Sequence, residues 1–195
     1  MRNIFDDIRT QLPPYLSAEQ KKELFEEISK FPNINYFTNK IGTNELLQGD
    51  GWSGLTVLDF PTGNRKQVKG VILSNTCDID VNNSRDTDVN IIFAPLVKLD
   101  NYTALLRANG VSDTALTDKI KAIKQQQVTS IMYIPKIGSM DVEYIINFDD
   151  IHSQPLSSFV TGGGTKLFTL SQSGFYVLLL KISIHFCRFQ EGIVR

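Results

Sequence analysis

Cysteine is scarce in this chain of 195 residues: the two present, Cys77 and Cys187, lie far apart and form no Cys-x-x-Cys pair. A disulfide framework requires more cysteines, and a structural zinc site requires closely spaced ligands, so the sequence argues against both classes. Two isolated thiols suit a reducing compartment. The cysteine content therefore predicts a cytoplasmic protein.

Long hydrophobic runs are also missing. The longest one covers residues 175–180 and is interrupted by Lys181, whereas a membrane-spanning helix needs about 20 apolar residues. The first residues lack the apolar stretch of a signal peptide. We therefore expect a soluble, intracellular protein that does not contact a membrane.

Neither sign of charge is in excess. The 20 Lys and Arg residues nearly balance the 21 Asp and Glu residues, which gives a formal net charge of −1. Such a chain has no bulk field to attract a polyanion, so nucleic-acid binding is disfavoured. The sequence also lacks internal repeats and low-complexity segments, and its length and composition predict a single globular domain over residues 1–195.

The first 50 residues predict an amphipathic helix and a connector. Ser17 is followed three residues later by Gln20, which is the pattern of a capping box. Apolar residues then recur at helical spacing on one face: Leu24, Phe25 and Ile28. Pro32 ends the helical pattern.

Residues 51–170 predict a β-rich body. Strands are expected at six places: 54–60, 67–77, 89–97, 128–136, 141–148 and 166–170. The turn signal at residues 61–64 joins the first two, and Pro95 is expected near a strand end or on an edge. A helical insertion is expected at about 99–127, with a stop at Asn109 and Gly110 and a new cap at Ser112 or Asp113.

The chain ends in a predicted long helix over residues 171–189, within a C-terminal segment 171–195. Ser171 is a suitable cap, and the helix is apolar almost all round in its first half, so we expect it to pack in a groove or against the sheet. Its predicted buried face contains Phe175, Leu178, Leu179, Ile182 and Phe186. Together these elements predict an α+β fold: a small, strongly bent sheet or a partly open SH3-like β-barrel, with the insertion and the two terminal helices around it.

Cys77 lies four residues after the end of an apolar strand core at residues 71–73. In an extended chain, Cys77 and Ile79 would share one face, and Asp78 and Asp80 the other. Two interpretations stay open. Cys77 could be a small buried hydrophobe, or it could be a nucleophile in a catalytic set with Asp78 and His185, because a thiol nucleophile needs a nearby base.

Oxygen-bearing side chains occupy every second position of the next segment: Asp78, Asp80, Asn82, Ser84 and Asp86. This spacing matches the first five ligand positions of an EF-hand loop, but Asn83 stands where glycine is required and Val89 where a glutamate should be. The segment is therefore not an EF-hand. A weaker calcium or magnesium site at Asp78, Asp80 and Asp86 is one interpretation, and a solvated polar turn is the other.

Basic residues recur along the last predicted helix. Lys181, His185 and Arg188 are spaced i, i+4 and i+7, which places them on one helix face. One interpretation is that Lys181 and Arg188 bind a phosphate or carboxylate while His185 acts as an acid, a base or a switch. The other is that the stripe is an ordinary solvent-exposed face.

Two functions fit these observations. The sequence contains no complete catalytic set, which favours an interaction module that binds a protein or peptide partner in an exposed groove lined by aromatic residues. The alternative is a hydrolase, with a Cys/Asp/His constellation or a divalent metal at residues 77–88. That alternative requires Cys77, Asp78, Asp80 and His185 to converge in one pocket.

Overall fold

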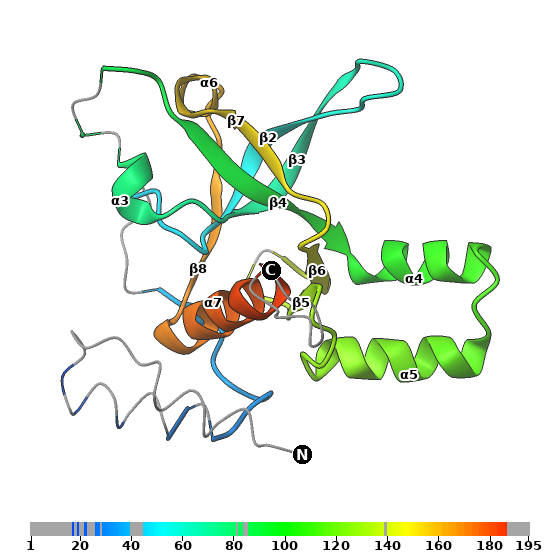
Figure 1. Cartoon of the computed structure of the whole chain (residues 1–195). Coiled ribbons are helices and arrows are strands. Elements are labelled where there is room, and N and C mark those ends of the chain that lie inside the picture. The colour runs from blue at the N-terminus through cyan, green and yellow to red at the C-terminus, as the bar shows by residue number, and fades with distance from the viewer. Residues whose placement is uncertain are drawn as a thin grey trace, which may run out of the picture.

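A computed structural model of the chain describes residues 17, 19, 22, 26, 27, 29–39, 45–80, 82, 83, 86–138 and 140–186. Within this part, the fold is α+β, with an antiparallel eight-stranded sheet that is not closed and the five helices α3 to α7 (Figure 1). None of the described helices is both long enough and apolar enough to cross a membrane.

The sheet is continuous from β1 at one edge to β5 at the other, in the order β1-β8-β2-β3-β4-β6-β5, and β7 pairs with β4. The strands are β1 (Phe37–Thr38), β2 (Gly51–Leu58), β3 (Arg65–Ile72), β4 (Asn90–Lys98), β5 (Ile131–Ile134), β6 (Tyr144–Asn147), β7 (His152–Pro155) and β8 (Lys166–Leu170). The predicted strand 166–170 matches β8. The sequence prediction missed β1 and β7, which are short and lack alternation.

Strands β2 and β3 form a long hairpin that projects from the body (Figure 1). Its turn lies at the predicted position, and the Asp59 amide donates to the Asn64 carbonyl at 2.9 Å. Leu55 and Val71 are completely buried at the base of the hairpin, whereas Phe60 in the turn is 83% exposed.

Strand β4 changes its neighbour part of the way along one edge. It pairs with β7 as far as Phe93 and with β6 from Leu96 onward, so Ala94 and Pro95 fall between the two partners. A residue without an N–H is tolerated at such a gap in the hydrogen-bond ladder. Pro95 therefore lies in the second half of the strand, where one side of β4 has neither β6 nor β7 as a partner.

The predicted strand 67–77 is wrong beyond Ile72. Residues Thr76–Ile79 form the short helix α3, because the Asn75 side chain accepts a hydrogen bond from the Cys77 amide at 2.9 Å and caps the turn. A local side-chain bond of this kind offers the backbone an alternative to the sheet ladder. As a result Ile79 is buried and Cys77 is exposed, so they do not share a face.

The predicted insertion is a helical hairpin that extends away from the sheet (Figure 1). Helix α4 (Leu99–Ala108) ends at Asn109, and α5 (Asp113–Lys124) begins after Ser112, whose side chain accepts from the Ala115 amide. The root of the hairpin packs on β5 and β6 through one apolar cluster: Leu99, Ile123, Ile131 and Ile145.

Helix α7 (Gln172–Phe186) closes the main core and is held at its start. The Ser171 hydroxyl accepts from the Gly174 amide at 3.1 Å and donates to the Asn35 carbonyl. Gly174 approaches the backbone so closely that a Cβ there would lie 2.4 Å from the Tyr36 carbonyl oxygen. This contact fixes the start of the helix against the segment that leads into β1.

Several predictions concern residues outside the described part of the chain. Glu19, Lys22, Glu26 and Glu27 are helical, as predicted for the N-terminal helix. Its proposed capping partner and apolar stripe lie outside the described residues: Gln20, Leu24, Phe25 and Ile28. The same holds for residues 187–195, which include Cys187 and Arg188.

A buried ion pair joins the start of β2 to β8. The Asp50 Oδ2 atom lies 2.8 Å from the Lys166 Nζ atom, and both side chains are at most 9% exposed. Burial raises the pKa of the Asp50 carboxyl, while Lys166 acts in the opposite direction. The Leu47 amide also donates to Oδ2, so the pair holds the 45–50 segment in place. Lys166 additionally lies over the ring of Trp52, at 5.4 Å from its centroid.

Candidate functional site

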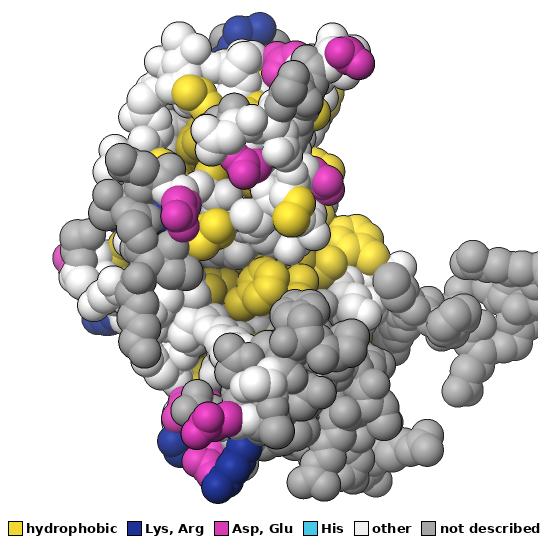
Figure 2. Space-filling view, turned by 90° about the vertical axis from the view of Figure 1, so that its left-hand side faces the viewer, with side chains coloured by type: hydrophobic (Ala, Val, Ile, Leu, Met, Phe, Trp, Pro, Cys, Tyr) yellow, Lys and Arg dark blue, Asp and Glu magenta, His cyan; other side chains and the backbone are white. Residues whose placement is uncertain are grey.

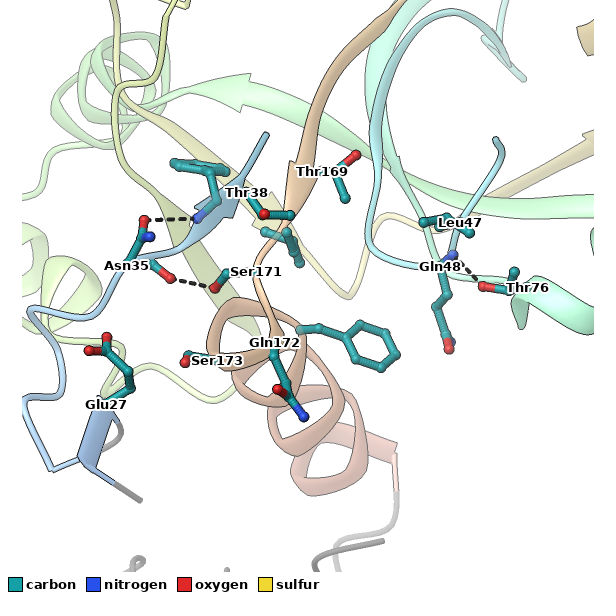
Figure 3. A pocket seen from close by; sticks show the side chains of 13 residues that line it. Glu27, Asn35, Thr38, Leu47, Gln48, Thr76, Thr169, Ser171, Gln172 and Ser173 are labelled. Atoms are coloured by element: carbon teal, nitrogen blue, oxygen red, sulfur yellow. Dashed lines mark hydrogen bonds between the residues drawn. The ribbon is translucent and has the colours of Figure 1, made fainter. Parts of the chain in front are cut away.

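Two adjoining hollows run along α7. The first has a volume of about 640 Å³ and lies between the start of α7, strand β1 and the 47–48 segment. Figure 3 shows Asn35, Thr38 and Gln172 on one side of it, with Gln48 and Thr76 facing them. Its apolar lining consists of Phe37, Leu47, Leu170 and Phe175.

The second hollow has a volume of about 600 Å³ and lies at the other end of α7. Its lining is mostly apolar: Leu73, Ile92, Phe148, Ile151, Ile182 and Phe186. Gln48 lines both hollows, so the two adjoin at this residue. We call this surface the α7 groove.

Gln48 is fixed where the two hollows meet. Its amide donates to the Thr76 Oγ1 atom at 3.0 Å, and its Nε2 atom donates to the Leu73 carbonyl at 2.7 Å. Gly49 follows at a φ of 89°, packed against Leu170, Phe175 and Leu178. This turn requires a residue that has a positive φ and no Cβ, which only glycine provides at little cost. Hydrogen bonds to Leu73 and Thr76 and the packing of Gly49 thus fix the position of Gln48 in the groove.

One stripe of α7 faces the groove. Phe175, Ile182 and Phe186 line the two hollows at i, i+7 and i+11, and Leu179 falls on the same stripe at i+4; all four side chains are at least partly exposed. The prediction that these residues form a buried face is therefore wrong for Phe186, which is 57% exposed; Leu178, by contrast, is completely buried. The reason is that the helix is apolar on more of its circumference than the core covers.

The face shown in Figure 2 has hydrophobic side chains gathered in a hollow across its middle, with acidic side chains above them. Ile92 contributes a second large exposed apolar group to the α7 groove, at 44% exposure. Contiguous exposed apolar surface of this kind marks interaction sites more often than isolated apolar residues do.

Two histidine–aspartate pairs lie at the second hollow and beside it. His185 Nε2 is 3.4 Å from Asp149 Oδ1, and His152 Nε2 is 2.8 Å from Asp150 Oδ1. The His185 ring also contacts Phe148 and Phe186, with centroid distances of 5.9 and 4.7 Å. His185 is therefore part of the groove wall, and its carboxylate partner is Asp149.

Lys181 is not part of an exposed basic stripe. Its side chain is buried, and Nζ donates to the Gln126 and Val128 carbonyls at 2.9 and 2.8 Å. Burial lowers the pKa of this ammonium from 10.5 to about 8. The contact ties α7 to the α5–β5 connection, where Gln126 has a positive φ of 58°. The anion-binding role predicted for Lys181 and Arg188 stays a prediction, and Arg188 lies outside the described residues.

The residues of the predicted catalytic set lie in different places. His185 lines the second hollow, Asp80 lines a third hollow of about 540 Å³ near α6 (Leu156–Thr161), and Cys77 and Asp78 are exposed on α3. Cys77 and Asp78 line none of these three hollows.

The third hollow gathers the predicted metal ligands only in part. Asp80 and Asp86 line it with Asp88, which accepts from the Ser157 hydroxyl at 2.6 Å. Asp80 Oδ1 accepts from both the amide and the side chain of Asn82, as in an ordinary Asx turn. Across the part of the chain that the structure describes, no group of three or more His, Cys, Asp or Glu side chains is arranged to hold a metal ion. The calcium or magnesium site stays a prediction.

The α7 groove contains residues that the sequence did not single out. Gln48, Thr76, Ile92 and Asp149 come from four separate segments, and none belongs to a recognisable motif. The one signal in the sequence was the excess of apolar residues on the last helix, more than one buried face needs.

Comparisons of the chain with protein-family models, with curated proteins and with solved structures give no match. The function is therefore inferred from the geometry of the groove.

Proposed function

We propose that this protein is an interaction domain that binds a peptide segment of a protein partner in the α7 groove. The observation that carries the proposal is the apolar stripe from Phe175 to Phe186, which faces two adjoining hollows instead of packing wholly into the core. Peptide and ligand sites are typically concave and apolar, with a few fixed polar groups. Gln48 and Thr76 would supply such groups in the middle of the groove.

The size of the groove suits a short segment. At about 1.5 Å of rise per residue, the stripe from Phe175 to Phe186 is about 16 Å long. About five residues of an extended peptide cover that distance, at about 3.3 Å each. Covering the exposed parts of Ile92 and Phe186 would contribute about 1 kcal/mol each. Because so short a segment buries less area than a standard protein interface, we expect weak, transient binding.

The shape of the sheet supports a recognition role. We infer that the open sheet is a variant of the SH3-like barrel, because the Gln154 side chain of β7 accepts from the Thr56 amide of β2 at 2.6 Å and so curls the sheet toward itself. Barrels of this class host many binding functions, although fold alone does not assign one. We also propose a cytoplasmic location, where the exposed Cys77 thiol would stay reduced.

The hydrolase alternative has less support. It required Cys77, Asp78, Asp80 and His185 in one pocket, and no two of them line the same one of the three hollows described above. His185 has a carboxylate partner in Asp149. A thiol nucleophile also needs its base within hydrogen-bond reach, and Cys77 is exposed on α3, outside the hollow that His185 lines.

The test is a selection of displayed random peptides on the immobilised chain, followed by fluorescence anisotropy with the enriched sequences. Ile92→Asp/Phe186→Asp places charges on two exposed groove residues and should abolish binding without unfolding the protein. Phe60→Asp is the matched control, because Phe60 is an even more exposed aromatic that does not line the groove. Peptides that bind the wild type and the groove variant equally well would contradict the proposal.

A further inference from the structure

The charges around the α7 groove are unevenly distributed. The ionisable side chains that line it are Glu27 at one end and Asp149 and His185 at the other; among the described residues, no Lys or Arg lines either hollow. In Figure 2, acidic side chains lie above the hydrophobic hollow, and Lys and Arg side chains lie beside further acidic ones at the upper and lower ends of this face. An apolar groove with one acidic end favours a ligand that carries positive charge.

At the first hollow, the charge of the one acidic side chain among the described lining residues is balanced by a neighbouring lysine. Glu27 forms an ion pair with Lys30, with 2.6 Å between Oε1 and Nζ. This side-chain bond from Lys30 lowers the pKa of the Glu27 carboxyl. Glu27 is thus paired with a lysine, whereas the partners of the carboxylates at the second end are histidines, which carry a charge only when protonated. A ligand therefore gains little at Glu27.

The second end carries two neighbouring carboxylates. Asp149 and Asp150 are 63% and 51% exposed, and each has a histidine partner on one oxygen. A carboxylate offers about four acceptor positions on its two oxygens, so each can take further donors. The nearest lysine on α7, Lys181, is buried and donates to the Gln126 and Val128 carbonyls. It therefore does not offset these charges at the surface.

We propose that the α7 groove selects a basic, apolar peptide segment: apolar side chains occupy the two hollows, and an adjacent Arg or Lys binds Asp149 and Asp150. This inference rests on the proposed function and adds the chemistry of the partner. Arginine suits the site because its planar guanidinium donates to two acceptors at once. Apolar contacts supply the affinity, and the exposed charges supply the choice of partner.

The probes are three pools of heptapeptides that share the same random apolar positions. They differ only in two fixed positions, which are both arginine, both serine or both glutamate. We expect the arginine pool to bind the wild type about fivefold more tightly than the serine pool, since exposed charge pairs are individually weak. The glutamate pool should bind most weakly, and added salt should narrow the differences.

Asp149→Asn/Asp150→Asn should remove the preference for arginine and leave the binding of the serine pool unchanged. Asp118→Asn/Asp141→Asn is the matched control, since both aspartates are exposed and neither lines the groove; it should keep the preference. Thermal unfolding of both variants checks that the fold is intact.

The outcomes separate the two proposals. If all three pools bind equally to the wild type and require Ile92 and Phe186, the groove binds peptides but the charge selection is wrong. If the arginine preference survives in Asp149→Asn/Asp150→Asn, it comes from elsewhere and the inference fails. If no pool binds, or if binding survives Ile92→Asp/Phe186→Asp, the proposed function itself fails.

Discussion

Lys181 gives the sharpest test of the packing of α7, because its burial makes folding stability depend on pH. In the unfolded chain the pKa of a lysine is about 10.5, and in the folded protein burial lowers it to about 8. Between these values the unfolded chain binds a proton that the native protein has already lost. The free energy of unfolding therefore rises with pH between about pH 8 and pH 10.5. Below about pH 8, Lys181 is protonated in both the folded and the unfolded protein, so it gives no pH dependence there.

The magnitude follows from the two pKa values. The difference between 10.5 and 8 corresponds to about 3 kcal/mol, at about 1.4 kcal/mol for each pH unit. Tyr36 and Tyr133 act with the opposite sign at higher pH, because burial raises both pKa values and the native state then keeps protons that the unfolded chain loses. Both tyrosines are present in wild type and variant, so their effects cancel in a comparison.

The assay is urea unfolding of the wild type and Lys181→Met, followed by circular dichroism from about pH 7 to about pH 10. The free energy of unfolding of the wild type should gain about 2–3 kcal/mol relative to the variant over this range. Lys121→Met is the control, because Lys121 is exposed on α5 and should not change the pH dependence. Parallel curves for the wild type and Lys181→Met would refute the reasoning, since they would mean that the Lys181 ammonium is hydrated in the folded protein.

Three further substitutions test the contacts that position the groove, each measured by urea unfolding. Lys166→Met should destabilise the fold by about 3–5 kcal/mol, because it leaves Asp50 buried without its counter-ion; the exposed Lys66→Met should have almost no effect, and equal values for the two would contradict the buried pair. Gly174→Ala should cost about 1–3 kcal/mol, because its Cβ meets a backbone carbonyl that has no room to move, whereas Ser183→Ala on the exposed side of α7 should be neutral. Ser171→Ala should cost about 1 kcal/mol through loss of the cap, and an unchanged stability would show that the cap does not hold the helix.

Much of the secondary structure could be predicted from the sequence because it depends on short-range chemistry. The turn at residues 61–64, the stop at Asn109 and the cap at Ser112 all lie where local signals put them. The same reasoning gave the wrong structure at Thr76–Ile79. The alternation of side chains predicted a strand, but the Asn75 cap starts a short helix there. A capped helix and a strand are alternative structures for the same few residues, and the sequence pattern alone did not indicate which of them is more stable.

The sequence by itself determined the α+β composition, the order of most elements and the apolar character of the last helix, since these follow from propensity and periodicity. Only the tertiary structure decided which apolar residues the core covers. Lys181 and Phe186 show the difference: the lysine is buried against two carbonyls, while the phenylalanine is more than half exposed. Helical spacing says which residues share a face, but burial depends on segments far away in the chain that pack against it. The α7 groove is built from such distant segments, so it exists only in the folded protein.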